Sequence, residues 1–260
     1  MNSRAIRLIA GTVLKESLRR REMYVLIFAA CSLLALVMSM DFFGLRGLSK
    51  FYREISLRVM GLTTAFAVIV LAARQLPREL ENRTIYPLLA RPIRRAEFLL
   101  GKLTGVLLAG IVCFALFMFI FLIGSLRMHA HIPWIHFLQH LYLQILMLAI
   151  LATLGFLLSM LVNTDAAITI CTLLFLLSAI SSMMLVNLYG YMDGMGRSIL
   201  LFLTYFLPQL TLFDFSEKTV HAEYWSPLTW TVLLTLSVYA CAYIAIYFMG
   251  ALLLFRRKEL

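Results

Sequence analysis

The feature that most constrains this chain is a set of long apolar runs, each about as long as a membrane-crossing helix. A helix needs about 20 mostly apolar residues to span the hydrocarbon core of a bilayer. Six runs meet this need, roughly at residues 23–40, 56–73, 98–126, 137–162, 167–188 and 227–255. Each run is continuous, whereas the strands of a membrane barrel show short alternating segments. The sequence therefore predicts an all-α membrane protein with six transmembrane helices.

Composition agrees with this class, because 62% of the residues are hydrophobic and only 14% are charged. Soluble domains carry about 25% charged residues. The segment 1–22 is too polar and too basic to form the apolar core of a signal peptide. We therefore expect two parts, an N-terminal arm at 1–22 and one transmembrane domain at 23–260.

Basic residues are concentrated on one side of the predicted membrane. Sixteen of the 23 Lys and Arg residues lie in 1–22, 74–102 and 256–258, and six lie in the segments of the other side. Basic residues near span ends stay in the cytoplasm. Both termini and the 74–102 stretch are therefore expected there, with the net charge of +10 facing anionic lipid. No basic stripe lies on a soluble domain, which argues against nucleic-acid binding.

Two segments outside the spans have helical patterns of their own. Residues 4–21 place apolar side chains at three- and four-residue steps with basic residues off this stripe. This pattern is typical of an amphipathic helix in the membrane interface, and a plain cytoplasmic tail is the alternative. The ten apolar residues 198–207, ended by Pro208, are too short to span. They predict a re-entrant or interfacial helix on the outer side, before the last span.

The stretch from Arg74 to Lys102 is a charged island between two apolar runs. It holds seven Lys and Arg residues, three glutamates, three prolines and an apolar patch at 85–90. Thr84 can cap a helix start, and Pro92 disfavours helix just before it, which predicts a short helix at 84–90. An apolar patch with charges around it is typical of a protein interface, and a linker packed on the membrane surface is the alternative.

These residues resemble a known family. The sequence from Glu79 to Lys102 resembles the loop between the second and third spans of ABC-2 type transporter permeases: an acidic stretch with Thr, then Leu-Leu, a basic-Pro step, Arg, Phe and Gly-Lys. The basic arm resembles the family's connecting helix. Leu207-Pro208 with Leu210 and Phe213, and the ending at 255–260, resemble further family elements. The nearest pattern is that of stand-alone permeases, including those linked to maturation of multicopper enzymes.

The resemblance implies a permease subunit of an ATP-driven exporter in a prokaryotic inner membrane. Two permease copies would form the substrate path and pair with two ABC ATPase subunits, with a periplasmic accessory protein left open as a further partner. Residues 84–90 would be the coupling helix that docks on the ATPase, whose closure switches the spans between inward-open and outward-open states. The expected coupling interface comprises Glu79, Glu81, Arg83, Thr84, Ile85, Tyr86, Leu88, Leu89, Arg91 and Arg95.

The chain lacks a phosphate-binding motif. We therefore expect ATP and Mg to bind to the partner ATPase and no cofactor to bind to this chain. Gly101-Lys102 lacks the upstream glycine and the following Ser or Thr of a GxxxxGK[ST] loop. The chain is therefore expected to be no enzyme. The acidic residues lie outside the span centres, which argues against a secondary transporter. A membrane scaffold that recruits a cytoplasmic partner without transport remains an alternative.

Hydroxyl residues within the spans are candidates for lining the path that the resemblance places at the dimer interface. They are Thr63 and Thr64 in the second run and Thr169, Thr172, Ser178, Ser181 and Ser182 in the fifth. Small hydroxyl residues also serve close helix packing, and the two roles can coexist. The substrate stays open among lipids, drugs, peptides and a sulfur carrier.

Four histidines cluster near the outer start of the fourth run: His129, His131, His136 and His140. With the nearby methionines they offer ligands that suit copper. The cluster has no cysteine and no required spacing, so we predict no metal site. The alternative role is packing at the membrane interface.

Overall fold

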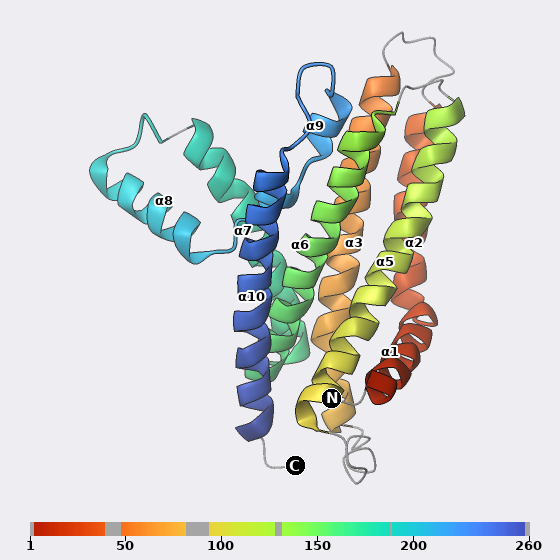
Figure 1. The fold of residues 1–260 in the computed structure, drawn as a ribbon, viewed down its shortest axis with the longest axis vertical. Coiled ribbons are helices and arrows are strands. Elements are labelled where there is room, and N and C mark those ends of the chain that lie inside the picture. Colours follow the sequence, from red (N-terminus) through yellow and green to blue (C-terminus); the bar gives the residue numbers. More distant parts are fainter. Residues whose placement is uncertain (1–2, 40–47, 82–93, 128–131, 188, 258–260) are drawn as a thin grey trace.

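The computed structural model describes residues 3–39, 48–81, 94–127, 132–187 and 189–257, and all regular structure there is helical (Figure 1). The helices are α1 (Ser3–Leu18), α2 (Arg21–Ser39), α3 (Leu48–Glu81), α5 (Arg95–Arg127), α6 (Trp134–Leu161), α7 (Thr164–Asn187), α8 (Gly194–Phe206), η2 (Leu210–Phe213, a 3-10 helix), α9 (Ser216–Val220) and α10 (Trp230–Arg257). The predicted all-α class is confirmed.

Five of these helices, α3, α5, α6, α7 and α10, are long and apolar enough to cross a membrane. The chain is therefore a multi-pass membrane protein. Helix α2 has 19 residues and coincides with the first predicted run, and the count of six spans stays a prediction. The long helices form an up-and-down bundle (Figure 1). We call its two ends the α1 end, where α10 also finishes, and the α9 end, where α3 begins.

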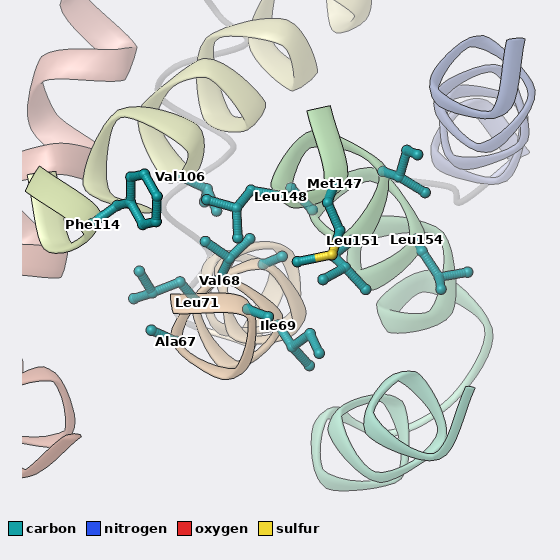
Figure 2. Packing of buried hydrophobic residues seen from close by; sticks show 14 of the residues in the cluster. Ala67, Val68, Ile69, Leu71, Val106, Phe114, Met147, Leu148, Leu151 and Leu154 are labelled. Atoms are coloured by element: carbon teal, nitrogen blue, oxygen red, sulfur yellow. The ribbon is translucent and has the colours of Figure 1, made fainter. Parts of the chain in front are cut away.

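Helices α3 and α6 form the centre of the bundle. Within their apolar windows, 56% of α3 and 61% of α6 is buried, against 17% of α7 and 22% of α10. Figure 2 shows Val68 of α3 lying between Val106 of α5 and Leu148 of α6. The approach is close because Gly110 of α5 has no side chain: a Cβ there would lie 2.5 Å from Val68 Cγ2. Small residues that let helix backbones come close are the usual means of association inside a bilayer.

The predicted amphipathic helix is confirmed as α1. Its apolar stripe packs against another helix of the same chain, a contact that the sequence analysis did not predict. Ile9 and Val13 are buried against α5, where Gly101 and Gly105 make room for them. A Cβ at Gly105 would lie 2.5 Å from Val13 Cβ and 3.0 Å from the carbonyl oxygen of Ala10. The stripe therefore packs into a glycine-lined groove on α5. Placement of α1 in the membrane interface stays a prediction.

Two other elements differ in length from their predicted runs. Helix α3 has 34 residues and continues through Pro77 to Glu81, although proline lacks the N–H that a helix interior requires. Helix α8 contains the predicted short segment 198–207 except its last residue, and its 13 residues are too few to span a bilayer. Figure 1 shows α8 projecting away from the bundle beside the end of α7.

Replacing Gly105 by Leu is expected to displace α1, because the new side chain would occupy the space of Val13. Overpacking of this kind costs about 1–3 kcal/mol. The measurements are the thermal midpoint in detergent and the rate of trypsin cleavage within residues 1–21. Gly11→Leu is the matched control, since no atom lies within 4 Å of a Cβ at Gly11. An unchanged cleavage rate and midpoint in the Gly105→Leu protein would contradict the docked position of α1.

Candidate functional site

The described part of the predicted coupling interface lies at the α1 end, in the last turn of α3 and the first turn of α5. Most of it falls outside the described residues, namely Arg83, Thr84, Ile85, Tyr86, Leu88, Leu89 and Arg91. The predicted helix at 84–90 lies outside them too. Glu81 is described only as the final residue of α3. Glu79 and Arg95 remain, and they show how the two helices that flank this connection are held.

A buried ion pair joins these helices. Lys102 Nζ of α5 donates a hydrogen bond to Glu79 Oε1 of α3, with only 5% of the Lys102 side chain and 22% of the Glu79 side chain exposed. The ammonium group also lies 5.7 Å from the centre of the Phe98 ring, a cation–π distance. Removing two charges from water costs several kcal/mol per ion, which pairing offsets. The last turn of α3 is therefore tied to the second turn of α5.

The first turn of α5 is capped by its own sequence. Glu97 Oε2 accepts a hydrogen bond of 3.3 Å from the backbone N–H of Arg94, the residue before the helix. This is one half of a capping box, in which the third helical residue reaches back to the N-cap. A carboxylate here also interacts favourably with the helix dipole. Helix α5 therefore begins at Arg95, ahead of the predicted run at 98–126, and this cap explains its start.

Arg95 connects α5 to the end of α10. Its Nη1 donates to the carbonyl oxygens of Phe255 at 3.2 Å and Arg256 at 2.9 Å. The last carbonyls of a helix have no partner within the helix, so this guanidinium satisfies two of them. The ring of Phe255 stacks on Phe98 with centroids 5.9 Å apart. The last turn of α3, the start of α5 and the end of α10 therefore meet in one cluster of contacting side chains: Glu79, Arg95, Phe98, Lys102 and Phe255.

The threonine candidates for the path bond mainly to their own helices. Thr64 Oγ1 donates to the carbonyl oxygen of Met60 at 2.6 Å. Thr169 and Thr172 donate to carbonyls one turn earlier in α7, at 2.9 and 2.8 Å. Thr63 is half-buried on α3. These contacts satisfy hydroxyl groups locally and neither require nor test a role in a path.

The serine candidates attach the segment after α8 to α7. Ser178 Oγ accepts a hydrogen bond of 2.7 Å from the backbone N–H of Leu210 in η2. The hydroxyl groups of Ser182 and Thr211 lie 2.5 Å apart. Ser181 donates to the carbonyl oxygen of Ser178 at 3.0 Å. This is the packing role of small hydroxyl residues, and the path-lining role stays a prediction.

The histidine candidates separate into individual contacts. His129 and His131 lie outside the described residues. His136 Nε2 lies 2.9 Å from the carbonyl oxygen of Trp225, and its ring stacks on Phe215. His140 is buried in α6, where neither ring nitrogen has a hydrogen-bond partner. Within the described part of the chain, no group of three His, Cys, Asp or Glu side chains could hold a metal ion.

Ion pairs at the α9 end hold the α9 segment against α3. Lys50 Nζ lies 2.9 Å from Glu223 Oε2, and this hydrogen bond lowers the pKa of the Glu223 carboxyl below its ordinary value. Arg58 lies 3.1 Å from Glu54 and 3.9 Å from Glu217. These pairs are largely exposed to solvent, so each contributes little to stability.

Sequence reasoning missed two functional details of the α1 end. The first is the pairing of Lys102 with Glu79, and the second is the docking of α1 on Gly101 and Gly105. A signal for the second was present in the G-x-x-x-G spacing of those glycines, a pattern of close helix contact. The signal for the ion pair was the presence of opposite charges, on Glu79 and Lys102, near the facing ends of two consecutive apolar runs.

Comparison with known proteins gives the family. A comparison with curated proteins found no match to this chain. Residues 27–260 match the family model described as ABC-2 family transporter protein. The match covers most of the chain, including the ion pair of Glu79 with Lys102 and the contact of Arg95 with α10. With its helical membrane fold, this chain belongs to the ABC-2 transporter family and is a permease component of an ABC transporter.

Proposed function

We propose that this chain is the transmembrane subunit of an ATP-driven exporter and that it receives its motion through the 74–102 stretch. The observation that carries the proposal is the buried pair of Glu79 and Lys102, which ties together the two helices that flank residues 82–93. Permeases of this family work with an ABC ATPase. We infer that this ATPase is a separate subunit, present in two copies, that binds ATP and Mg and docks on residues 84–90.

A docked partner can move the bundle only through rigid attachments. Glu79 on α3 and Lys102 on α5 provide one attachment, and Arg95 extends it to the end of α10. Helix α1 packs on α5 and would travel with it. A displacement of residues 82–93 would therefore move α3, α5 and α1 as one body, which is the rigid-body type of switching.

The gathering of basic residues at one end of the bundle supports an orientation in the membrane. The basic arm α1, Arg74, Arg94 and Arg95 lie on elements that meet at the α1 end, together with the C-terminal turn of α10 (Figure 1). Because basic residues near span ends stay in the cytoplasm, we assign this end to the cytoplasm of a prokaryotic cell and the α9 end to the outer side.

A second permease copy would complete the path at α7. This helix leaves most of its apolar window exposed in the single chain, whereas α6 buries most of its own. Leu173, Leu177 and Ile180 are among its exposed side chains. Helix α10 is exposed to nearly the same extent, so the choice of α7 rests on the path that the family resemblance implies for the fifth run. We infer that the partner copy packs on α7 and that lipid covers the outer face of α10.

The dimer is tested by cross-linking in membranes. In a variant whose four cysteines are replaced by serine, Ile180→Cys on α7 is expected to form a disulfide-linked dimer on oxidation. Leu234→Cys on α10, 66% exposed, is the control and is expected to stay monomeric. Cross-linking at position 234 without cross-linking at position 180 would place the second copy elsewhere.

The double variant Leu88→Asp/Leu89→Asp tests the docking of the ATPase. Two carboxylates in an apolar contact would be desolvated without partners, so we expect the ATPase to be lost from the purified complex or its hydrolysis to be uncoupled. Co-purification and ATPase activity in nanodiscs are the measurements. The control is Tyr191→Asp/Tyr224→Asp, two side chains exposed toward the α9 end. Unchanged assembly and coupling in the leucine variant would refute the assignment.

The Glu79–Lys102 pair has a separate test in which stability and coupling diverge. Glu79→Gln leaves the buried Lys102 ammonium group without its carboxylate and is expected to destabilise the permease by about 3–5 kcal/mol. Lys102→Met is expected to cost less, because the Glu79 side chain is 22% exposed. The double variant removes both charges, so its thermal midpoint should largely recover. Its ATP-driven conformational change, followed by spin labels on α3 and α5, should stay reduced. Full recovery of both quantities in the double variant would show that the pair is only structural.

A further inference from the structure

A cavity of about 180 Å³ lies among α3, α6, α7 and η2, toward the α9 end. None of the seven hydroxyl residues predicted to line a path borders it. Its apolar wall includes Leu62, Phe175 and Leu176. Leu62 is 53% exposed and Leu176 is 46% exposed, so this wall continues into the outer surface of the helices. An apolar molecule could therefore enter from the side of the bundle.

The polar wall of the cavity offers mainly hydrogen-bond acceptors. Asp214 accepts two hydrogen bonds at Oδ1, both from Ser216, through its backbone N–H and its hydroxyl group. No Lys, Arg or His side chain in the described ranges forms an ion pair with Asp214. Gln144 is buried and uses its Nε2 to donate to the carbonyl oxygen of Gly61, which leaves its Oε1 as an acceptor.

The wall of the cavity carries one charged side chain of each sign, Arg58 and Asp214. The Arg58 guanidinium already has two carboxylate partners, Glu54 and Glu217. Asp214 is the carboxylate that borders the cavity itself, and no ion pair among the described residues includes it. Its titratable neighbour is the buried His140 of α6, which interacts with it electrostatically. With Arg58 neutralised by its own carboxylate partners, the Asp214 carboxylate beside an apolar wall attracts a cation more strongly than a carboxylate in water would.

The remaining lining groups also suit a cation with an apolar body. Phe175 offers an aromatic face, which attracts quaternary and primary ammonium groups within about 6 Å of the ring. Met147 adds a polarisable thioether that adapts to the shape of a ligand. Typical drug-sized pockets measure about 300–1,000 Å³, so this cavity fits a smaller molecule, such as one ring or a short alkyl chain.

We propose that this cavity is a binding site for a small lipophilic organic cation, with the ammonium group beside Asp214 and the apolar body against Leu62, Phe175 and Leu176. The site goes beyond the proposed coupling to an ATPase and does not depend on it. Binding belongs to the permease chain alone, because every lining residue comes from this chain.

The test uses the purified permease, without ATPase, in nanodiscs of phosphatidylcholine. Benzyltrimethylammonium is the probe, and its affinity is measured by calorimetry against the neutral carbon isostere neopentylbenzene and the anion benzenesulfonate. We expect saturable binding of the cation, at least tenfold weaker binding of the neutral isostere and no binding of the anion. Equal affinity for cation and isostere, or no saturable binding of the cation, would overturn the proposal.

Variants locate the site. Asp214→Asn keeps an oxygen for Ser216 and removes the charge, so cation affinity should fall at least tenfold. Glu223→Gln removes one charge from the same end of the bundle without bordering the cavity, and affinity should stay within twofold. An equal loss in both variants would mean attraction to diffuse surface charge and would refute the site.

A filling variant protects the test against misfolding. Ala179→Phe places a ring in the cavity from the exposed side of α7 and is expected to abolish binding of the probe. If Asp214→Asn lowers the thermal midpoint, the Ala179→Phe variant becomes the deciding test. Retained binding of the probe by Ala179→Phe overturns the proposal. Lost binding by Ala179→Phe, with the thermal midpoint of that variant unchanged, supports it. These binding measurements contain no ATPase, so the outcome of the Leu88→Asp/Leu89→Asp experiment does not affect them. The coupling proposal and the cation-site proposal can therefore fail independently.

Discussion

Close packing of α3 between α5 and α6 is the constraint on which the rest of this structure depends. Inside a bilayer the lipid tails are as apolar as the side chains, so helices associate through van der Waals contact and not through release of water. Gly110 lets Val68 approach α5, and Gly155 lets Ala72 approach α6. Because α3 is 34 residues long, this one central helix positions Glu79 at one end of the bundle and Arg58 at the other.

The two ends use charge in opposite ways. At the α1 end, Glu79 and Lys102 pair in a buried setting, and Arg95 caps the end of α10, so the charges there hold helices together. At the α9 end, Asp214 borders an open cavity and takes part in none of the ion pairs of the described residues. A paired and buried charge gives rigidity, whereas an unpaired one beside an apolar wall gives affinity. The first arrangement suits the transmission of motion and the second suits the binding of a ligand.

Helix positions followed well from the sequence, because a membrane leaves a spanning chain few ways to satisfy its backbone. The start of α5 at Arg95 was predictable from Pro92 and Glu97, since both act within a few residues. The continuation of α3 past Pro77 was not, because packing against neighbouring helices overrides a local preference. Pairing of Glu79 with Lys102 depends on how two helices rotate about their axes, and the cavity depends on four elements meeting. Neither is encoded in any single window of sequence.

The docking of α1 has a consequence for biosynthesis. Its partner groove on α5, at Gly101 and Gly105, is translated more than 80 residues after α1 itself. During chain elongation the N-terminal helix therefore exists for seconds without its final contact, at the usual rate of about 5–20 residues per second. An amphipathic, basic helix can wait on an anionic lipid surface in that interval. The two faces of α1 could thus serve successive stages, with the helix resting on lipid in the nascent chain and packing on α5 in the finished permease.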